Sequence, residues 1–174
     1  QALKAGVTLN LAAPEQPVFV RGEADELTQM IQNLTENALR YGRKNGTVNL
    51  IINEATSHPK FDHEGTCCSI SVNDDGEGIA EEHLPRLTER FYRVDTGRSR
   101  KMGGTGLGLA IVKHIVNRHR GMMDVTSRLG HGTSFSIYLG IAQPTDLSLL
   151  DETAERQQIQ KKLKSRKRTR TPTI

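Results

Sequence analysis

The chain is short of the residues that mark several protein classes. It has no tryptophan, only three tyrosines and four phenylalanines, and two cysteines among 174 residues. Its apolar runs are a few residues long, whereas a membrane-spanning helix needs about 20 apolar residues in a row, so we expect a soluble segment. Cys67 and Cys68 are neighbours in a strand-like run. Their side chains should point to opposite faces and cannot easily bridge each other. A metal site would need further ligands at suitable spacing, so we expect thiols in a reducing compartment.

Charge divides the chain into two parts. Residues 143–174 hold eight of the 24 basic residues and four of the 20 acidic ones, and 8 − 4 gives the whole net charge of +4. The first 142 residues are balanced, and with ordinary apolar content they predict one domain over 1–142. We expect 143–174 to be a basic extension with a short helix near 151–163 and disorder elsewhere. A solvated tail is favoured over contact with anionic lipid, and no nucleic-acid partner is expected.

Periodicity predicts the secondary structure. Apolar alternation and turn residues favour strands at 7–12, 18–21, 47–54 and 66–74, and a final hairpin of 122–127 with 133–139. Helical spacing favours helices at 24–41, 81–86 and 106–120. The mixed order of strands and helices predicts an α+β sandwich, with one mixed sheet and its helices on a single face.

The two long helices should each have an apolar side. In 24–41 the predicted core stripe consists of Leu27, Met30, Ile31, Leu34 and Ala38. In 106–120 we expect these residues to point inward: Leu107, Ala110, Ile111, His114 and Ile115. On a neighbouring face of the first helix, helical spacing lets four polar side chains converge: Asn33, Asn37, Arg40 and Tyr41.

Separate segments of the chain fit one ligand. They are NLTENALRY at 33–41, DDGEGI at 74–79, GGTGLGLAIVKHI at 103–115 and GHGTSF at 130–135. Each alone is weak evidence, because glycine clusters are usually turns and helical asparagines are usually solvated. Their order and their placement at strand and helix ends together predict a magnesium–nucleotide site.

The asparagines and the aspartate suggest distinct tasks. The amide oxygen of Asn37, assisted by Asn33 one turn earlier, is a hard neutral ligand that suits Mg²⁺. Asp74 ends a hydrophobic strand before two glycines that allow close approach to a flat ring. A carboxylate there would accept the exocyclic amine of adenine and repel the carbonyl of guanine.

The glycine-rich segment at 103–115 precedes a helix. Its N-terminal amides and dipole favour phosphate, and Thr105 can supply a hydroxyl, but the Lys-Ser/Thr pair of a Walker loop is absent. Arg98, Arg100 and Lys101 lie on a segment that could close over a triphosphate, and a solvated cationic loop explains them equally well. The turn at 130–133 either lines the pocket or is a plain hairpin turn.

These motifs, with ERFYRVD at 89–95, resemble the asparagine, glycine and phenylalanine boxes of sensor histidine kinases. The resemblance covers about 7–139, and the stretch from 83 to 121 is most similar to sensors of the phosphate-regulon type. It implies the Bergerat ATP-binding fold, a two-layer α+β sandwich shared with gyrase and a family of chaperones, and it implies ATP and Mg²⁺ as ligands.

The resemblance also implies roles for individual residues. Asn33 and Asn37 would lie on the metal side, and Arg40 and Tyr41 would contact the nucleotide. The candidate catalytic residues are Asn37, Arg40, Arg90 and Arg93. Arg90 or Arg93 would reach toward phosphate or a partner domain. Phe91 would pack the lid. The remaining nucleotide-binding candidates are Asp74, Gly76 and Gly78 at the adenine, Gly104, Gly106 and Gly108 under the phosphates, and Thr133 in the last box. Four neighbouring residues complete the set: Ile79, Thr105, Leu107 and Leu109.

Departures from the family pattern shape the functional prediction. Gyrase-like relatives carry a water-activating glutamate where this chain has Asn33, so we expect phosphate transfer to another group, with hydrolysis slower by a factor of roughly 10² to 10⁴. Asp75 replaces the usual asparagine. No phosphoacceptor histidine motif is present, and Gln1 replaces a starting methionine, so we expect the catalytic domain alone, cut from a longer protein.

The expected function is therefore transfer of the ATP γ-phosphate to a histidine on a separate dimerisation domain. The expected partners are that domain, a response regulator and a second parent subunit. The domain itself would be cytoplasmic, with its parent anchored in the bacterial inner membrane. Two alternatives stay open: an ATPase of the same fold, and a catalytically inactive module that binds partners under nucleotide control.

Overall fold

The computed structural model describes residues 6–56, 67–94 and 105–142. One compact unit of the chain spans Gln1–Ile141, and the description below concerns that unit. The predicted lid residues Arg98, Arg100 and Lys101 lie outside the described residues, as do Gly104, the connection 57–66 and the extension 143–174.

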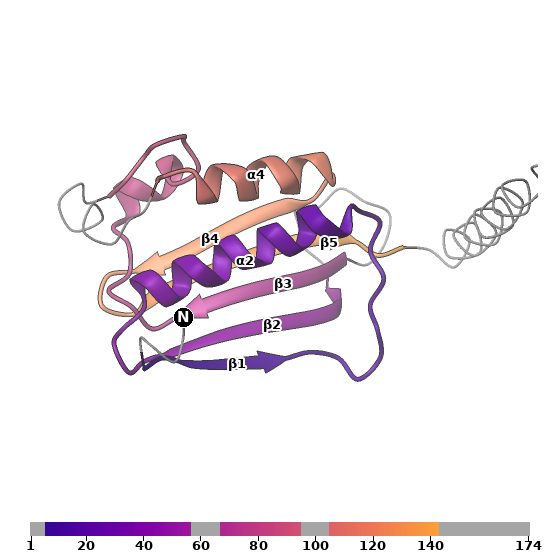
Figure 1. Cartoon of the computed structure of the whole chain (residues 1–174), viewed down its shortest axis with the longest axis horizontal. Helices are drawn as coiled ribbons and strands as arrows, with labels where there is room; N and C mark the ends of the chain where they lie inside the picture. Colours follow the sequence, from indigo (N-terminus) through magenta and orange to yellow (C-terminus); the bar gives the residue numbers. More distant parts are fainter. Residues whose placement is uncertain (1–5, 57–66, 95–104, 143–174) are drawn as a thin grey trace, which may run out of the picture. The chain divides into compact units, whose positions relative to one another are not determined.

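A five-stranded sheet forms one layer of the unit, with strand order β1-β2-β3-β5-β4 (Figure 1). Its strands are β1 (Thr8–Ala12), β2 (Thr47–Thr56), β3 (Cys67–Asp74), β4 (Met122–Arg128) and β5 (Gly132–Gly140). The β1–β2 pair is parallel and the other pairs are antiparallel. The predicted mixed sheet is therefore confirmed.

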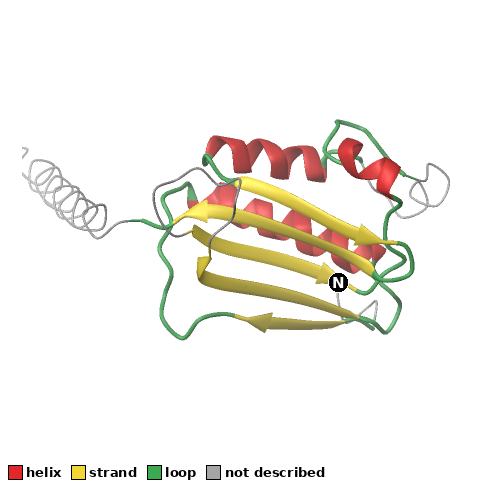
Figure 2. Ribbon diagram, turned by 180° about the vertical axis from the view of Figure 1, so that it is seen from behind, coloured by secondary structure: helices red, strands yellow, loops and turns green. Residues whose placement is uncertain are grey.

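The helices form the second layer. α2 (Ala24–Tyr41), the short 3₁₀ helix η1 (Glu81–Arg86) and α4 (Gly108–Arg118) all lie on one face of the sheet, and the other face is free of helices in the rear view (Figure 2). This confirms the predicted α+β sandwich. Among the described residues, no helix is both long and apolar enough to span a bilayer.

The apolar stripe of α2 packs on the sheet as predicted. Met30, Leu34 and Ala38 are buried, and Leu27 and Ile31 pack against the same core. Asp25 and Glu26 occupy the first turn, where negative charge interacts favourably with the helix dipole. The stripe therefore fixes the rotation of α2, and with it the direction in which the polar residues of 33–41 point.

Side chains alternate sharply between the two faces of the sheet. Val72, Phe135 and Ile137 are buried under the helices. The helix-free face bears short polar groups that bond across strands: Ser71 to Ser136 at 2.9 Å, Ser134 to Asn73 at 2.6 Å and Asn10 to Asn49 at 2.9 Å. Because the period is two residues, strand register decides which polar residues end up beneath the helices.

Two sequence predictions are wrong. The segment 18–21 is not a strand: only Val20 forms an isolated bridge, with Ile141. His114 does not point inward but is exposed, whereas Ile115 is buried as predicted and Ile111 packs against the core. Val112 and Val116, which were not predicted to point inward, are also buried. The apolar face therefore centres on Val112 and Val116 rather than on Leu107 and His114, and the helix begins at Gly108 rather than at 106. Cys67 and Cys68 are buried thiols.

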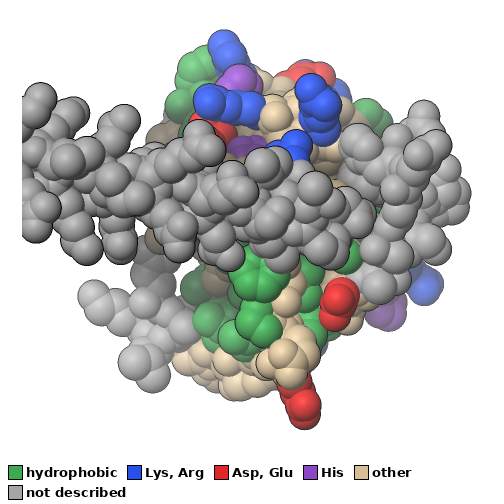
Figure 3. Space-filling view, turned by 90° about the vertical axis from the view of Figure 1, so that its right-hand side faces the viewer, with side chains coloured by type: hydrophobic (Ala, Val, Ile, Leu, Met, Phe, Trp, Pro, Cys, Tyr) green, Lys and Arg blue, Asp and Glu red, His purple; other side chains and the backbone are tan. Residues whose placement is uncertain are grey.

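The end of the molecule away from the β4–β5 turn is held by a histidine. His119, with a side chain only 5% exposed, accepts a hydrogen bond from Glu23 N at Nε2 (3.0 Å), so its Nδ1 carries the proton and donates to Ile115 O (2.8 Å). Arg118 pairs with Glu26 at 2.8 Å. These contacts join the end of α4 to the start of α2. Figure 3 shows Lys, Arg and His side chains gathered at the top of this end, on the α4 side.

Candidate functional site

Strand register places three polar side chains in one row on the helix-covered face. Asp74 of β3 lies opposite Thr133 of β5, which lies opposite Ser127 of β4. Asp74 was predicted at the adenine and Thr133 in the last glycine box. The row lies where β3 ends and the β4–β5 turn begins, beside the buried core residues of the same strands.

The Asp74 carboxylate is held by the backbone. Its Oδ1 accepts a hydrogen bond from Gly76 N at 2.9 Å. Burial raises the pKa of Asp74 and is the largest effect, while hydrogen bonds from the backbone of Gly76 and Thr133 lower it and the neighbouring Asp75 charge raises it. A carboxylate in this position is oriented for a ligand, at some cost in solvation.

Glycines let the loop after Asp74 pack closely. A Cβ on Gly76 would collide with Tyr41 O at the end of α2, so only glycine fits there. Gly78 has φ +70° and a Cβ there would collide with Arg128 O. The loop 74–79 is thereby fitted between the end of α2 and the β4–β5 turn.

Asp75 ties this loop to the start of β2. Its Oδ2 accepts a hydrogen bond from Thr47 N at 2.9 Å, and its buried Oδ1 has no hydrogen-bond partner among the described residues. The charge that this residue brings in place of asparagine therefore lies inside the loop rather than at its surface.

Ser127 is a site residue that the sequence motifs missed. Its Oγ accepts from Ile79 N at 2.8 Å, donates to Gly132 O at 2.8 Å and lies 2.9 Å from Thr133 Oγ1. It therefore joins the loop 74–79 to the last glycine box. The alternation of strand 122–127 carried the only signal, since it places Ser127 on the same face as Val125.

The predicted metal ligands meet the start of α4. A Cβ on Gly108 would lie 3.5 Å from Asn33 Oδ1 and 3.8 Å from Asn37 Nδ2. The Asn33 Nδ2 is buried and has no hydrogen-bond partner among the described residues. Buried polar groups normally have partners, so this amide is fitted to a ligand that it can bond. Arg40 is partly buried in the last turn of α2, and Tyr41 is 43% exposed.

Backbone contacts couple the phenylalanine box to the glycine-rich segment. Phe91 N donates to Gly106 O at 2.9 Å, and both residues have positive φ, +65° and +72°. The Phe91 side chain is 71% exposed. Whether it packs the lid stays a prediction, because the lid lies outside the described residues. Thr105 Oγ1 accepts a long hydrogen bond of 3.4 Å from Leu107 N at the entry to α4.

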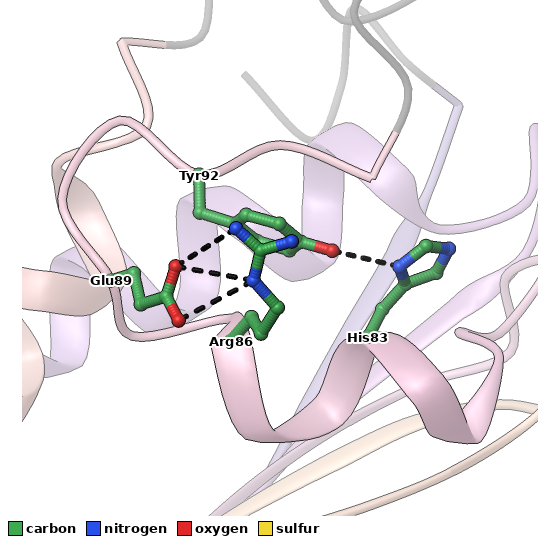
Figure 4. A network of polar contacts seen from close by, with 4 residues as sticks. All are labelled: His83, Arg86, Glu89 and Tyr92. Atoms are coloured by element: carbon green, nitrogen blue, oxygen red, sulfur yellow. Dashed lines mark hydrogen bonds and ion pairs between the residues drawn. The ribbon is translucent and has the colours of Figure 1, made fainter.

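The rest of this box is fixed to η1 (Figure 4). Tyr92 OH lies 2.8 Å from His83 Nδ1, and the Arg86 guanidinium stacks 4.2 Å from the centre of the Tyr92 ring. Arg86 also pairs with Glu89 at 3.2 Å. This network holds the backbone that leads to Arg93, whose Nε and Nη2 are buried with no partner among the described residues, whereas Arg90 is exposed.

Two cavities lie among the described residues, and the side chains there limit how a metal ion could be bound. A cavity of about 350 Å³ at the β4–β5 turn includes Asp74, Ser127 and Thr133 in its lining, but it is also lined by Asn73 and Ser134 of the helix-free face. A larger one, about 450 Å³, lies between η1, α4 and β4 and contains none of the predicted site residues. Within the described ranges, no three or more His, Cys, Asp or Glu side chains are grouped to hold a metal ion. A magnesium ion would therefore depend on the asparagine amides and on oxygens of the ligand.

Comparison with known proteins agrees with this geometry. A family model described as "Histidine kinase-, DNA gyrase B-, and HSP90-like ATPase" matches residues 22–143. The chain is 40% identical over 144 residues to the phosphate regulon sensor protein PhoR of Pseudomonas aeruginosa, covering 82% of this chain and 30% of that protein. It is 38% identical over 126 residues to the sensor histidine kinase WalK of Bacillus subtilis, covering 72% and 20%.

Solved structures show the same fold. The mycobacterial sensor histidine kinase MprB superposes with a TM-score of 0.65 at 25% identity, covering 80% of this chain and 86% of that one. The catalytic domain of histidine kinase ThkA superposes with a TM-score of 0.63 over 79% of this chain, and at 20% identity it supports the fold alone. The chain spans less than a third of the length of the two curated relatives, 30% and 20%.

Proposed function

The chain belongs to the family of histidine kinase-, DNA gyrase B- and HSP90-like ATPases, and on that premise we propose that it binds Mg-ATP and hands the γ-phosphate to a histidine on a separate domain. One observation carries the proposal: the Asn33 side chain, whose Nδ2 is buried with no hydrogen-bond partner among the described residues, places its Oδ1 at the start of α4 beside Asn37. An amide there needs a polar ligand, and the start of a helix favours phosphate.

The adenine end of the site is the row at the end of β3. The ionised Asp74 carboxylate accepts hydrogen bonds, so it can receive those of an exocyclic amine. Gly76 and Gly78, with Ile79, form the loop against which a flat ring would lie, and Thr133 supplies a hydroxyl on the same face. This combination supports adenine over guanine as the base.

The phosphate end of the site is the junction of α2 and α4. Backbone amides of 106–109 begin α4 and would meet the phosphates, and Asn33 and Asn37 would hold the metal ion. A magnesium ion bound there would neutralise charge on the phosphate oxygens. Of the two candidate arginines, Arg93 is the better supported, because its buried N–H groups need an anion, whereas Arg90 is already solvated.

Transfer is favoured over hydrolysis by the side chain at position 33. Asn33 occupies the place from which a glutamate activates water in gyrase-like relatives, and an amide cannot serve as a base. The acceptor imidazole brings its own lone pair, so positioning and charge neutralisation suffice. The ATPase and the inactive binding module are the competing functions, and the absence of a base at 33 disfavours the first.

The partners follow from the same proposal. The acceptor would be the histidine-bearing dimerisation domain of a homodimeric parent, and a response regulator would receive the phosphate next. The parent would be anchored in the bacterial inner membrane with this domain in the cytoplasm. The 40% identity to a phosphate regulon sensor supports a parent of that type.

The test begins with calorimetric titration of non-hydrolysable ATP with and without Mg²⁺. We expect magnesium-dependent binding that is weakened at least tenfold in Asn37→Asp, because the new carboxylate would repel the triphosphate bound beside it. Gln32→Glu adds the same charge to an exposed position of the same helix and should bind like the wild type.

Phosphotransfer is tested by adding the histidine domain of a close relative in trans with labelled ATP. Appearance of acid-labile phosphohistidine supports the kinase, and steady phosphate release by the chain alone would support the ATPase instead. Binding without either product, even with the parent's own histidine domain restored, would point to the inactive module. Magnesium-dependent binding that survives unchanged in Asn37→Asp would refute the metal assignment.

A further inference from the structure

The Ser127 hydroxyl is saturated with hydrogen bonds. It has one proton and two lone pairs. A carbonyl oxygen cannot donate, so the single proton goes to Gly132 O at 2.8 Å. One lone pair receives Ile79 N–H at 2.8 Å. The remaining lone pair faces Thr133 Oγ1 at 2.9 Å.

This count fixes the direction of the last bond. With its own proton given to Gly132, Ser127 can only accept from Thr133, so the Thr133 hydroxyl proton points at Ser127 Oγ. The lone pairs of Thr133 Oγ1 are then what it offers to a ligand. In the opposite arrangement, the buried Gly132 would lose the hydrogen bond from Ser127 to its carbonyl oxygen, which costs about 1–3 kcal/mol.

We propose that Ser127 is a specificity-determining residue, which makes Thr133 a hydrogen-bond acceptor toward the base and so selects 6-amino purines over 6-oxo purines. Thr133 and the carboxylate of Asp74 lie opposite each other in the strand register. Together they present acceptors only. An amine satisfies both, directly or through a water, whereas a carbonyl oxygen meets two lone-pair groups and no donor.

The inference rests on the proposed nucleotide function and adds a residue outside every glycine and asparagine motif. Ser127 acts through Thr133, so it positions a proton rather than touching the base. If Ser127 only stabilised the fold, its removal would weaken the binding of all nucleotides alike. In the proposed role, its removal changes the ratio of the affinities for the two bases.

The test compares ATP with inosine triphosphate, which replaces the 6-amino group of adenine with an oxygen. Non-hydrolysable forms of both are titrated with Mg²⁺ into wild type, Ser127→Ala, Ser127→Thr and Ser136→Ala. We expect wild type to bind the ATP analogue more tightly than the inosine analogue. In Ser127→Ala the ratio of the two affinities should fall about tenfold, because Thr133 can then turn its proton to the ligand. Ser127→Thr keeps the hydroxyl and should restore the ratio. Ser136→Ala removes a bonded serine from the helix-free face and should leave the ratio unchanged.

The outcomes distinguish the role of Ser127 from the proposed nucleotide binding. A wild type that binds no nucleotide refutes both. A wild type that prefers ATP, with the same preference retained in Ser127→Ala, refutes the role of Ser127 and leaves the nucleotide site standing.

A neutron structure of the wild type provides a test that requires no variant to fold. Deuterium on Thr133 Oγ1 directed at Ser127 Oγ is the expected result, and a Ser127 deuterium directed at Thr133 overturns the inference.

Discussion

At the scale of single residues, Asp74 must remain ionised in a partly buried position in order to accept a hydrogen bond from an amine. Burial raises its pKa above the ordinary 3.8. We expect ATP affinity to rise with pH through that raised pKa.

The contribution of Asp74 to stability changes with pH in the opposite direction, because a raised pKa in the folded state favours folding only while the carboxyl is protonated. The free energy of unfolding of wild type, relative to Asp74→Asn, should fall from about pH 3.8 upward and level off above the raised pKa. Parallel denaturation and binding series measure both trends.

The neighbouring Asp75 adds to the effect of burial on that transition. Its charge raises the pKa of Asp74, while its Oδ2 accepts from Thr47 N. Asp75→Asn keeps an acceptor and removes the charge, so the midpoint of ATP binding against pH should move to lower pH. Asp25→Asn, an exposed position at the start of α2, is the matched control and should not move it. An unchanged midpoint in Asp75→Asn would show that Asp75 does not act on Asp74.

Residue types predicted part of the site and could not predict the rest. Asp74, Asn33 and Asn37 were identifiable because they occur in dense motifs at the ends of elements. Ser127 was not, since a serine in a strand has no motif of its own and gains its role only from the register between β4 and β5. Roles for the individual site residues stay predictions until binding is measured.

At the scale of elements, Gly106 links the phenylalanine box to the start of α4. Its φ is +72°, and a Cβ there would lie 2.9 Å from both Cα and C of Phe91. We expect Gly106→Ala to lose about 1–3 kcal/mol of unfolding free energy and at least tenfold in ATP affinity, measured by denaturant titration and calorimetry. In Gly140→Ala the added Cβ enters open space, so that variant should stay within about 0.5 kcal/mol of wild type.

The second contact between elements is the tie that His119 makes between α4 and α2. His119→Ala leaves Glu23 N without its partner and removes one of the two hydrogen bonds that Ile115 O accepts, so the free energy of unfolding should fall by about 1–3 kcal/mol. ATP affinity should stay within about twofold, because the tie lies at the end of the molecule away from the β4–β5 turn. His114→Ala, on the exposed side of the same helix, is the control. Equal losses in both variants would mean that the tie contributes nothing specific.

Helices and strands were predicted correctly where the apolar pattern was long, and wrongly where it was short. The 18 residues of α2 were predicted with their buried stripe, because five apolar positions agree on one face. The segment 18–21 alternates too, but a strand also needs a partner along its length, and only Val20 finds one. His114 was misplaced because the helix carries two possible apolar stripes, and packing on the sheet uses the one with Val112 and Val116.

At the scale of the whole molecule, the boundary at 142 is still a prediction. A chain shortened to residues 1–142 should unfold with a free energy within about 0.5 kcal/mol of the full chain and bind ATP equally well. Its formal net charge would drop from +4 to zero, so its solubility near neutral pH should be lower. Loss of folding or of ATP binding would show that the domain extends into the basic extension.

The row of Asp74, Thr133 and Ser127 also has an evolutionary consequence. Each residue reaches the site through the register of its strand, and a slip of one position would turn its side chain to the opposite face. Insertions and deletions inside β3, β4 and β5 should therefore be purged from descendants of this gene. Length changes should accumulate instead in the connections between elements, where drift alters the outline of the protein without disturbing which side chains face the base.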